Sequence, residues 1–236
     1  MDFDDLTLKP PSSAGALREA FGVLELPRLL LRAPQLARQP QGKGEPVVVL
    51  PGFGAGDMST LVLRSYLRML GYDARGWTLG RNSGDVRHLL PRVLASLAAI
   101  ARESQTEVRL IGWSLGGYIA REAARERPDL VDRVITMGSP VVGGPKYTLA
   151  AHAYRRRGFD LDAIEAAIHA RNSNPLRIPV TAIYSRNDGV VAWQACIDRH
   201  CANVEHVEVS STHLGLGFAP DVYEIVAQRL AAPRVG

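Results

Sequence analysis

From Val47 onward, short runs of β-branched residues alternate with longer amphipathic runs. Parallel strands joined by crossover helices produce this alternation, because a helix must cover the sheet before the next strand begins. The pattern predicts an α/β fold with a mostly parallel sheet of about six strands and helices on both faces. We expect strands at Pro46 to Leu50, Asp73 to Trp77, Val108 to Ile111, Val134 to Met137, Val180 to Tyr184 and Val204 to Val209.

Amphipathic runs between these strands predict the crossover helices, and prolines at 128 and 179 lie where helices stop and strands begin. The expected helices are Thr60 to Leu70, Val86 to Glu103, Leu115 to Glu126, Val191 to Arg199 and Asp221 to Leu230. The interval 143–177 is longer than an ordinary connection and contains a helix-like run at Leu161 to Ala170. We expect it to form a small cap over the carboxyl ends of the strands, where open α/β sheets bind ligands.

Residues 1–44 contain no strand-like run, so they predict an N-terminal arm followed by a main domain over 45–236. The arm has apolar positions interleaved with arginines, broken by Pro27 and Pro34: Leu26, Arg28, Leu29, Leu30, Arg32 and Leu36. This pattern suits a leucine stripe packed on the main domain, which we favour, or a face that lies on a membrane surface.

The composition is that of a globular protein. Hydrophobic residues make up 46% of the 236 positions and charged residues 22%, which excludes a disordered or fibrous chain. The formal charge is +4, but the arginines are scattered, and the one basic cluster, Arg155 to Arg157, has no interleaved aromatic residues. We therefore expect no nucleic-acid partner, although the cluster could favour anionic substrates or surfaces.

The chain shows no targeting signal. Its opening, Met1 to Asp5, is acidic where a secretory signal is basic, and no apolar stretch approaches membrane-spanning length, so a cytoplasmic location is the default expectation. Cys196 and Cys201 do not form a C-x-x-C pair, which argues against a zinc site. We expect two small buried apolar residues, with a local disulfide left open if a helix ends between them.

The segment Gly112-Trp113-Ser114-Leu115-Gly116-Gly117 joins the third predicted strand to a predicted helix. A G-x-S-x-G pattern between a strand and a helix is typical of a nucleophile elbow, a sharp turn that exposes the serine hydroxyl. Glycines let the strand and helix close around the strained serine. The pattern also fits a plain strand-to-helix connection, so its context must decide.

A serine hydroxyl needs a nearby base and an acid that orients the base. Asp188 follows the fifth predicted strand and His213 follows the sixth, so both lie just past the carboxyl ends of strands, as Ser114 does. Asn-Asp-Gly is also a turn signal, and a loop histidine is usually just exposed. The coincidence of three such positions favours a Ser-Asp-His triad. Other candidates lie inside predicted helices, the cap or the last strand: His88, His152, His169, Asp198, His200 and His206.

Two backbone amides are placed to bind the oxyanion that forms when a serine adds to a carbonyl. Leu115 N–H begins the helix after Ser114, and Phe53 N–H lies in the glycine-rich loop after the first strand. That loop also resembles a dinucleotide-binding turn. The resemblance fails in detail, because Asp57 stands where the third glycine of G-x-G-x-x-G is needed.

With these residues in place, the chain resembles the α/β-hydrolase superfamily, and within it small bacterial lipase- and esterase-like members, over roughly residues 45–231. The resemblance implies a carboxylic-ester hydrolase that works through Ser114, Asp188 and His213 and an acyl-enzyme, without cofactor or metal. It also implies an apolar acyl pocket beside the elbow, formed by the cap and by three residues: Trp113, Met137 and Pro140.

Two departures from the family are visible. Many relatives have His-Gly at the oxyanion loop where this chain has Pro51-Gly52, and the antiparallel strands that often open the fold are missing. The same scaffold also carries thioesterases, amidases, acyltransferases and perhydrolases, and a non-catalytic small-molecule binding protein is the alternative of a different class. The sequence does not predict the oligomeric state.

Overall fold

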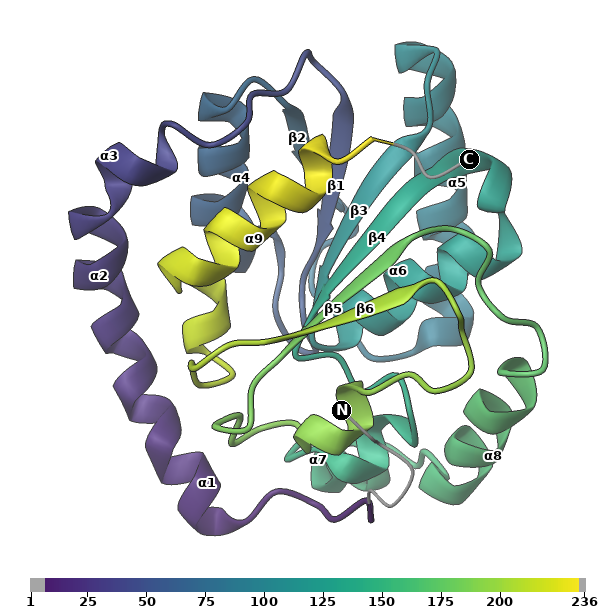
Figure 1. Cartoon of the computed structure of the whole chain (residues 1–236). Helices are drawn as coiled ribbons and strands as arrows, with labels where there is room; N and C mark the ends of the chain where they lie inside the picture. Colours follow the sequence, from purple (N-terminus) through teal and green to yellow (C-terminus); the bar gives the residue numbers. More distant parts are fainter. Residues whose placement is uncertain (1–6, 234–236) are drawn as a thin grey trace.

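The core of the protein is a six-stranded sheet in which all neighbouring strands are parallel. The computed structural model describes residues 7–233, and the strand order is β2-β1-β3-β4-β5-β6 (Figure 1). The strands are β1 Pro46–Leu50, β2 Asp73–Gly76, β3 Val108–Trp113, β4 Val131–Met137, β5 Val180–Tyr184 and β6 Val204–Glu208. The predicted α/β class and the six-stranded parallel sheet are therefore confirmed.

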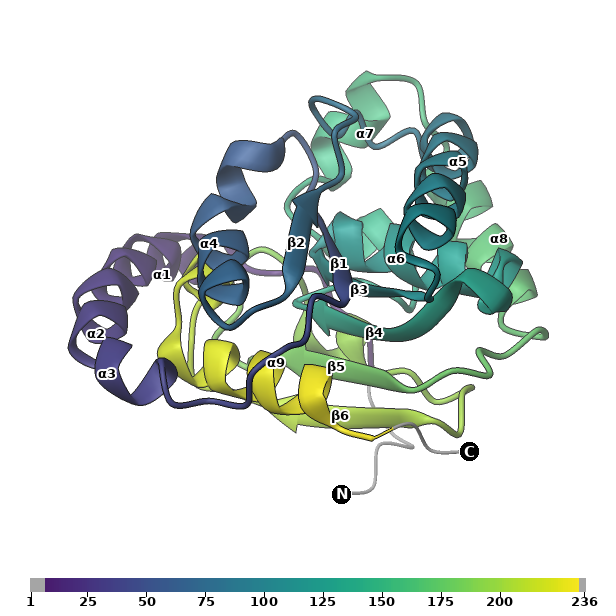
Figure 2. The ribbon, with the colours of Figure 1, turned by 90° about the horizontal axis from the view of Figure 1, so that it is seen from above.

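Helices cover both faces of this sheet. Figure 2 shows α4 (Leu61–Met69) and α9 (Pro220–Ala231) on one side, with α5 (Val86–Ser104) and α6 (Leu115–Glu126) on the other. Alternate residues of β1 explain the division, because successive side chains of a strand point to opposite faces. Val47 and Val49 pack in the cluster that includes α4 and α9, whereas Val48 and Leu50 pack in the cluster that includes α5 and α6.

The helix predicted over Val191 to Arg199 is wrong, because only a 3₁₀ turn, η5 (Trp193–Cys196), forms there. The first N–H groups of this segment have partners outside it: Val191 N–H donates to the Asp188 side chain, and Ala192 N–H donates to the carbonyl of Tyr147 at 3.0 Å. The apolar residues of the segment are buried on several sides rather than along one helical face. Both thiols, at Cys196 and Cys201, are buried and free.

The interval between β4 and β5 contains η4 (Gly144–Tyr147), α7 (Ala151–Arg156) and α8 (Leu161–Arg171). Helix α7 packs over the loops that follow β1 and β2. The Tyr154 ring lies 4.9 Å from the Phe53 ring, and its hydroxyl donates to the Gly84 carbonyl at 3.3 Å. The interval therefore covers the carboxyl ends of the first two strands.

The N-terminal segment consists of α1 (Ser13–Arg18), η1 (Glu19–Leu24), α2 (Glu25–Leu31) and α3 (Ala33–Leu36), and it runs past α9 (Figure 1). Pro27 and Pro34 lie in the first turns of α2 and α3, where a helix needs no proline N–H.

Only part of the leucine stripe faces the main domain. Leu36 is buried and Leu29 packs against the core, whereas Leu30 is 75% exposed and Leu26 is also exposed. The inward positions of η1 and α2 hold two buried carboxylates, Glu19 and Glu25. Over residues 7–233, no helix is both long enough and apolar enough to span a membrane.

Candidate active site

Ser114 stands on a strained turn between β3 and α6. Its backbone has φ +55° and ψ −124°, and its N–H donates to the Met137 carbonyl at 2.8 Å. The flanking glycines permit the close approach of strand and helix: a Cβ at Gly116 would lie 2.3 Å from the Leu50 carbonyl oxygen, and one at Gly112 would lie 2.3 Å from Gly117 Cα. The local sequence thus explains how a serine is held in a conformation that non-glycine residues avoid.

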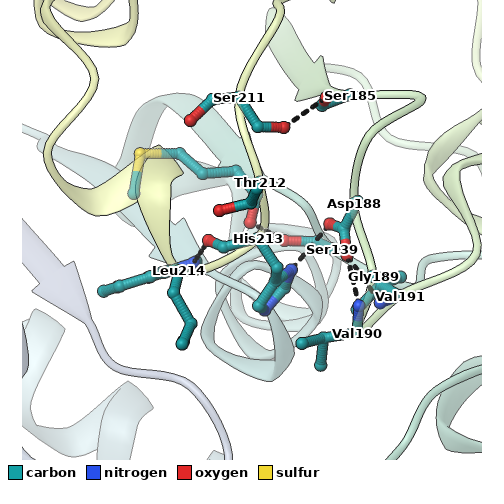
Figure 3. A network of polar contacts seen from close by, with 12 residues as sticks. Ser139, Ser185, Asp188, Gly189, Val190, Val191, Ser211, Thr212, His213 and Leu214 are labelled. Carbon is teal, nitrogen blue, oxygen red and sulfur yellow. Dashed lines mark hydrogen bonds and ion pairs between the residues drawn. The ribbon is translucent and has the colours of Figure 1, made fainter. Parts of the chain in front are cut away.

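Asp188 and His213 contact each other although they come from different loops. Asp188 Oδ2 lies 2.6 Å from His213 Nδ1, and Asp188 Oδ1 accepts the backbone N–H groups of Val190 and Val191 at 2.9 and 2.7 Å (Figure 3). The Asp188 side chain is fully buried and that of His213 is 5% exposed. With a proton on Nδ1 donated to the carboxylate, Nε2 is left to act as a base.

The loop of His213 is tied to the strand that ends at Ser114. Trp113 Nε1 donates to the His213 carbonyl at 3.2 Å. Gly138, at the end of β4, has φ +56°, and a Cβ there would lie 2.9 Å from both Asp188 Oδ2 and His213 Nδ1. The stretches that carry Ser114, Asp188 and His213 therefore lie at the same carboxyl edge of the sheet, after β3, β5 and β6.

The two amides expected to bind an oxyanion are free of protein partners. Among the residues that the structure describes, neither Phe53 N–H nor Leu115 N–H donates a hydrogen bond. Leu115 is the first residue of α6, where a helix leaves its N–H groups unsatisfied and the helix dipole is positive.

Asn82 supports the loop that carries Phe53, and the sequence analysis did not identify it. It is fully buried, its side-chain amide donates to the Pro51 carbonyl at 2.9 Å, and its backbone carbonyl accepts the Gly54 N–H at 2.8 Å. The Ala55 carbonyl accepts the Asn82 N–H at 2.8 Å. These contacts hold the loop without the His-Gly pair common in the family.

A cavity of about 700 Å³ opens beside Ser114 and lies under the cap interval. Phe53, Leu115 and Pro140 line it, together with residues of α7 and α8 such as Tyr154 and Ile168. One wall carries an ion pair between Glu122 and Arg171.

Trp113 and Met137 were expected to line the substrate pocket, but neither residue lines this cavity. Both side chains are buried in the core cluster on the α4 and α9 side of the sheet. The Trp113 ring also packs against Gly217, where a Cβ would lie 2.6 Å from it. The position of a residue beside Ser114 in the sequence does not predict the face of the sheet on which its side chain lies, because successive residues of a strand alternate between faces.

Two of the other candidates for the acid and base roles, Asp198 and His206, have structural partners. Asp198 is buried against Arg121 and lies outside any helix, contrary to the mid-helix position expected from the sequence. Burial raises the pKa of Asp198, but the Arg121 charge and the His200 N–H outweigh it and hold the pKa below its ordinary value. His206 Nε2 accepts the Asp198 N–H at 3.0 Å. Across residues 7–233, no group of three His, Cys, Asp or Glu could hold a metal ion.

A second buried residue, Glu19 of η1, contacts the loops that carry Asp188 and His213. Its carboxylate accepts backbone N–H groups from the loop of Asp188 and from the loop of His213. Nothing in the local sequence of the arm indicated this role, because an isolated glutamate in a helix is usually exposed.

The fold and this site define an α/β hydrolase. The model of the alpha/beta hydrolase family matches residues 47–233, and the chain belongs to that family. A curated relative, the pimeloyl-[acyl-carrier protein] methyl ester esterase of Aeromonas hydrophila subsp. hydrophila, is 31% identical over 104 residues. That match covers 42% of this chain and 39% of the relative, so it spans less than half of either protein.

Solved structures share the fold at lower identity. Aspergillus fumigatus lipase B superposes with a TM-score of 0.61 and 17% identity, covering 83% of this chain and 54% of the lipase. A thioesterase domain from the curacin biosynthetic pathway gives a TM-score of 0.55 and 14% identity, covering 82% of this chain and 93% of that domain. At such identities the likeness establishes the fold alone.

Proposed function

We propose that the protein is a serine hydrolase that cleaves carboxylic esters. The observation that carries the proposal is the 2.6 Å contact between Asp188 and His213 at the same sheet edge as the strained Ser114. Nucleophilic acyl transfer by a serine requires an imidazole as its base and a carboxylate that orients the imidazole.

Each residue has a definite role in the reaction. His213 takes the proton of Ser114 as the hydroxyl oxygen attacks the acyl carbon, and Asp188 stabilises the imidazolium that forms. The N–H groups of Phe53 and Leu115 donate to the oxyanion of the tetrahedral intermediate. His213 then protonates the departing alcohol, which leaves an acyl group on Ser114. Water activated by His213 releases the acid.

The cavity favours an ester with an apolar acyl chain of moderate size. Its volume of about 700 Å³ lies in the range of small-molecule sites, and its walls near Ser114 include Phe53 and Pro140. The Aeromonas relative is a methyl ester esterase, which supports an ester substrate. Thioester cleavage is the alternative, because a thioesterase domain is among the similar structures.

A panel of p-nitrophenyl esters of increasing chain length tests the proposal. The parent should hydrolyse them and be labelled at Ser114 by a fluorophosphonate, whereas Ser114→Ala should lose roughly 10⁶-fold in kcat and all labelling. Ser139→Ala is the matched control, since Ser139 is a buried serine just past the end of the neighbouring strand β4. It should remain active.

Two results would contradict the proposal. Hydrolysis of the esters by Ser114→Ala at the rate of the parent would remove the serine from the chemistry. Absence of both hydrolysis and labelling in the parent would favour a binding protein. Product analysis with a competing alcohol separates hydrolysis from acyl transfer, because a transferase would yield the new ester.

A further inference from the structure

Glu19 is a buried carboxylate that lies far from the triad in the sequence but against it in the fold. It is 8% exposed. Its Oε1 accepts the N–H of Gly189 at 2.7 Å and the N–H of His213 at 3.0 Å, and its Oε2 accepts the N–H of Leu214 at 2.7 Å.

These donors account for the burial of the charge. Among the described residues, no Lys, Arg or His pairs with Glu19, so its hydrogen bonds come from the protein backbone. An ionised carboxylate only accepts hydrogen bonds. Three N–H groups donate to Glu19 and it donates to none, which matches an ionised carboxylate. Hydrogen bonds to a charged group are about twice as strong as neutral ones. The site is therefore built to hold a carboxylate rather than a neutral side chain.

The donors belong to the two loops that carry the proposed acid and base. Gly189 directly follows Asp188, and the second donor is the backbone amide of His213 itself. One carboxylate thus joins the loop after β5 to the loop after β6 through their backbone N–H groups, whereas Asp188 and His213 join the same loops through their side chains.

The arm is seated closely on both loops. A Cβ at Gly189 would lie 2.1 Å from the Gly15 carbonyl oxygen, and one at Gly22 would lie 2.9 Å from the Gly215 N. Glycines at these positions let the arm backbone approach the loops without intervening side chains, and this approach brings Glu19 within reach of both.

We propose that Glu19 is a positioning residue that sets the distance between the Asp188 and His213 loops, and so the placement of the imidazole against Ser114. The inference rests on the proposed hydrolase function. Without the carboxylate, three backbone N–H groups lose their acceptor and the loops are free to separate. A displacement of about 1 Å at a reacting group costs roughly 100-fold in rate.

Glu19→Gln tests the proposal, because the amide keeps the size of the side chain but presents a donor where one carboxylate oxygen accepts. We expect kcat to fall by about ten- to a hundredfold while KM changes by less than about threefold. The rate of fluorophosphonate labelling at Ser114 should fall by the same factor. The rates are compared at a temperature where circular dichroism shows every variant folded.

Glu25→Gln is the matched control. Glu25 is the other buried carboxylate of the arm, but it accepts the Ser211 hydroxyl at 3.0 Å and pairs with Arg28 at 2.8 Å rather than binding a loop amide. A purely structural contribution of the arm predicts that both variants lose stability and that neither loses kcat selectively. Positioning predicts a loss of kcat at Glu19 alone.

A second variant keeps the test decisive if Glu19→Gln does not fold. Glu19→Asp retains the charge but shortens the side chain by one methylene, so it cannot reach both loops, and kcat should again fall at a nearly constant KM. A parent-like kcat in a folded Glu19 variant would overturn the proposal, as would an equal loss of kcat in Glu25→Gln. Hydrolysis by Ser114→Ala would instead refute the hydrolase mechanism itself.

Discussion

Asp188 and His213 lie 25 residues apart in the sequence, and a 2.6 Å contact joins Asp188 Oδ2 to His213 Nδ1. The other oxygen of Asp188 is held by the N–H groups of Val190 and Val191, so the carboxylate cannot turn away from the imidazole. Asp188 therefore orients the imidazole ring of His213.

Asp188→Asn should lower kcat by about 10⁴-fold. The amide oxygen can still accept the Val190 and Val191 N–H groups, so the amide nitrogen faces His213 Nδ1 and forces the proton onto Nε2. An imidazole in that tautomer cannot accept the serine proton. Steady-state kinetics on a p-nitrophenyl ester measures the effect. Asp129→Asn, at an exposed aspartate, serves as the control.

Asn82→Ala should lower kcat with a smaller effect on KM, because the loop that carries Phe53 N–H loses its support. Loss of one oxyanion donor costs about 3 kcal/mol, and a loosened donor should cost part of this. The variant also leaves the Pro51 carbonyl without the amide donor, at about 1–3 kcal/mol of folding free energy. Asn203→Ala removes a bond to the Arg177 carbonyl, far from the site, and should leave kcat unchanged.

Ala167→Phe should shorten the preferred acyl chain. Ala167 lies on α8 and lines the cavity, so a ring at this position fills space that a longer chain would occupy. The ratio of kcat/KM for octanoate to acetate esters should fall about tenfold or more, since each methylene buried is worth about 0.8 kcal/mol. Ala166→Phe places the same ring on the next residue of α8, outside the cavity lining. An equal change in both variants would argue against this cavity as the acyl site.

Asp198→Asn should destabilise the protein at neutral pH by about 3–5 kcal/mol, because it leaves the Arg121 charge buried without its partner. The pKa of Asp198 is held below its ordinary value of 3.8 in the folded state. A lowered folded pKa contributes stability that is complete above the ordinary value and is lost as the pH falls through the folded pKa.

The difference in unfolding free energy between the parent and Asp198→Asn should therefore shrink as the pH is lowered below 3.8, since the parent also loses the ion pair there. Urea unfolding at pH 7 and at pH 3 measures it. Asp162→Asn breaks an exposed pair with Lys146 and should leave the unfolding free energy nearly unchanged at either pH. A difference for Asp198→Asn that does not depend on pH would show that the pKa of Asp198 is not lowered in the folded state.

The alternation of apolar strands with amphipathic helices was enough to predict the six strands of the parallel sheet and four of the five helices expected between and after them. A strand that is buried on both faces, such as β1, is a continuous apolar run, so it can be predicted without knowledge of its partners. The turn at Ser114 could also be predicted, because its glycines and its strained serine form one local pattern. Asp188 and His213 were found by their places after strands, since parallel strands bring those ends to one edge.

Only the tertiary structure decided which residues support the site. Glu19 and Asn82 act on backbone groups of residues at least 27 positions away in the chain, and no local pattern encodes such partners. The segment 191–199 has an apolar pattern suited to a helix, but its first two N–H groups bond to the Asp188 side chain and to the Tyr147 carbonyl of the interval between β4 and β5 instead. Periodicity in a sequence records how much of each residue is buried, whereas the choice of hydrogen-bond partner depends on which distant segments the fold brings together.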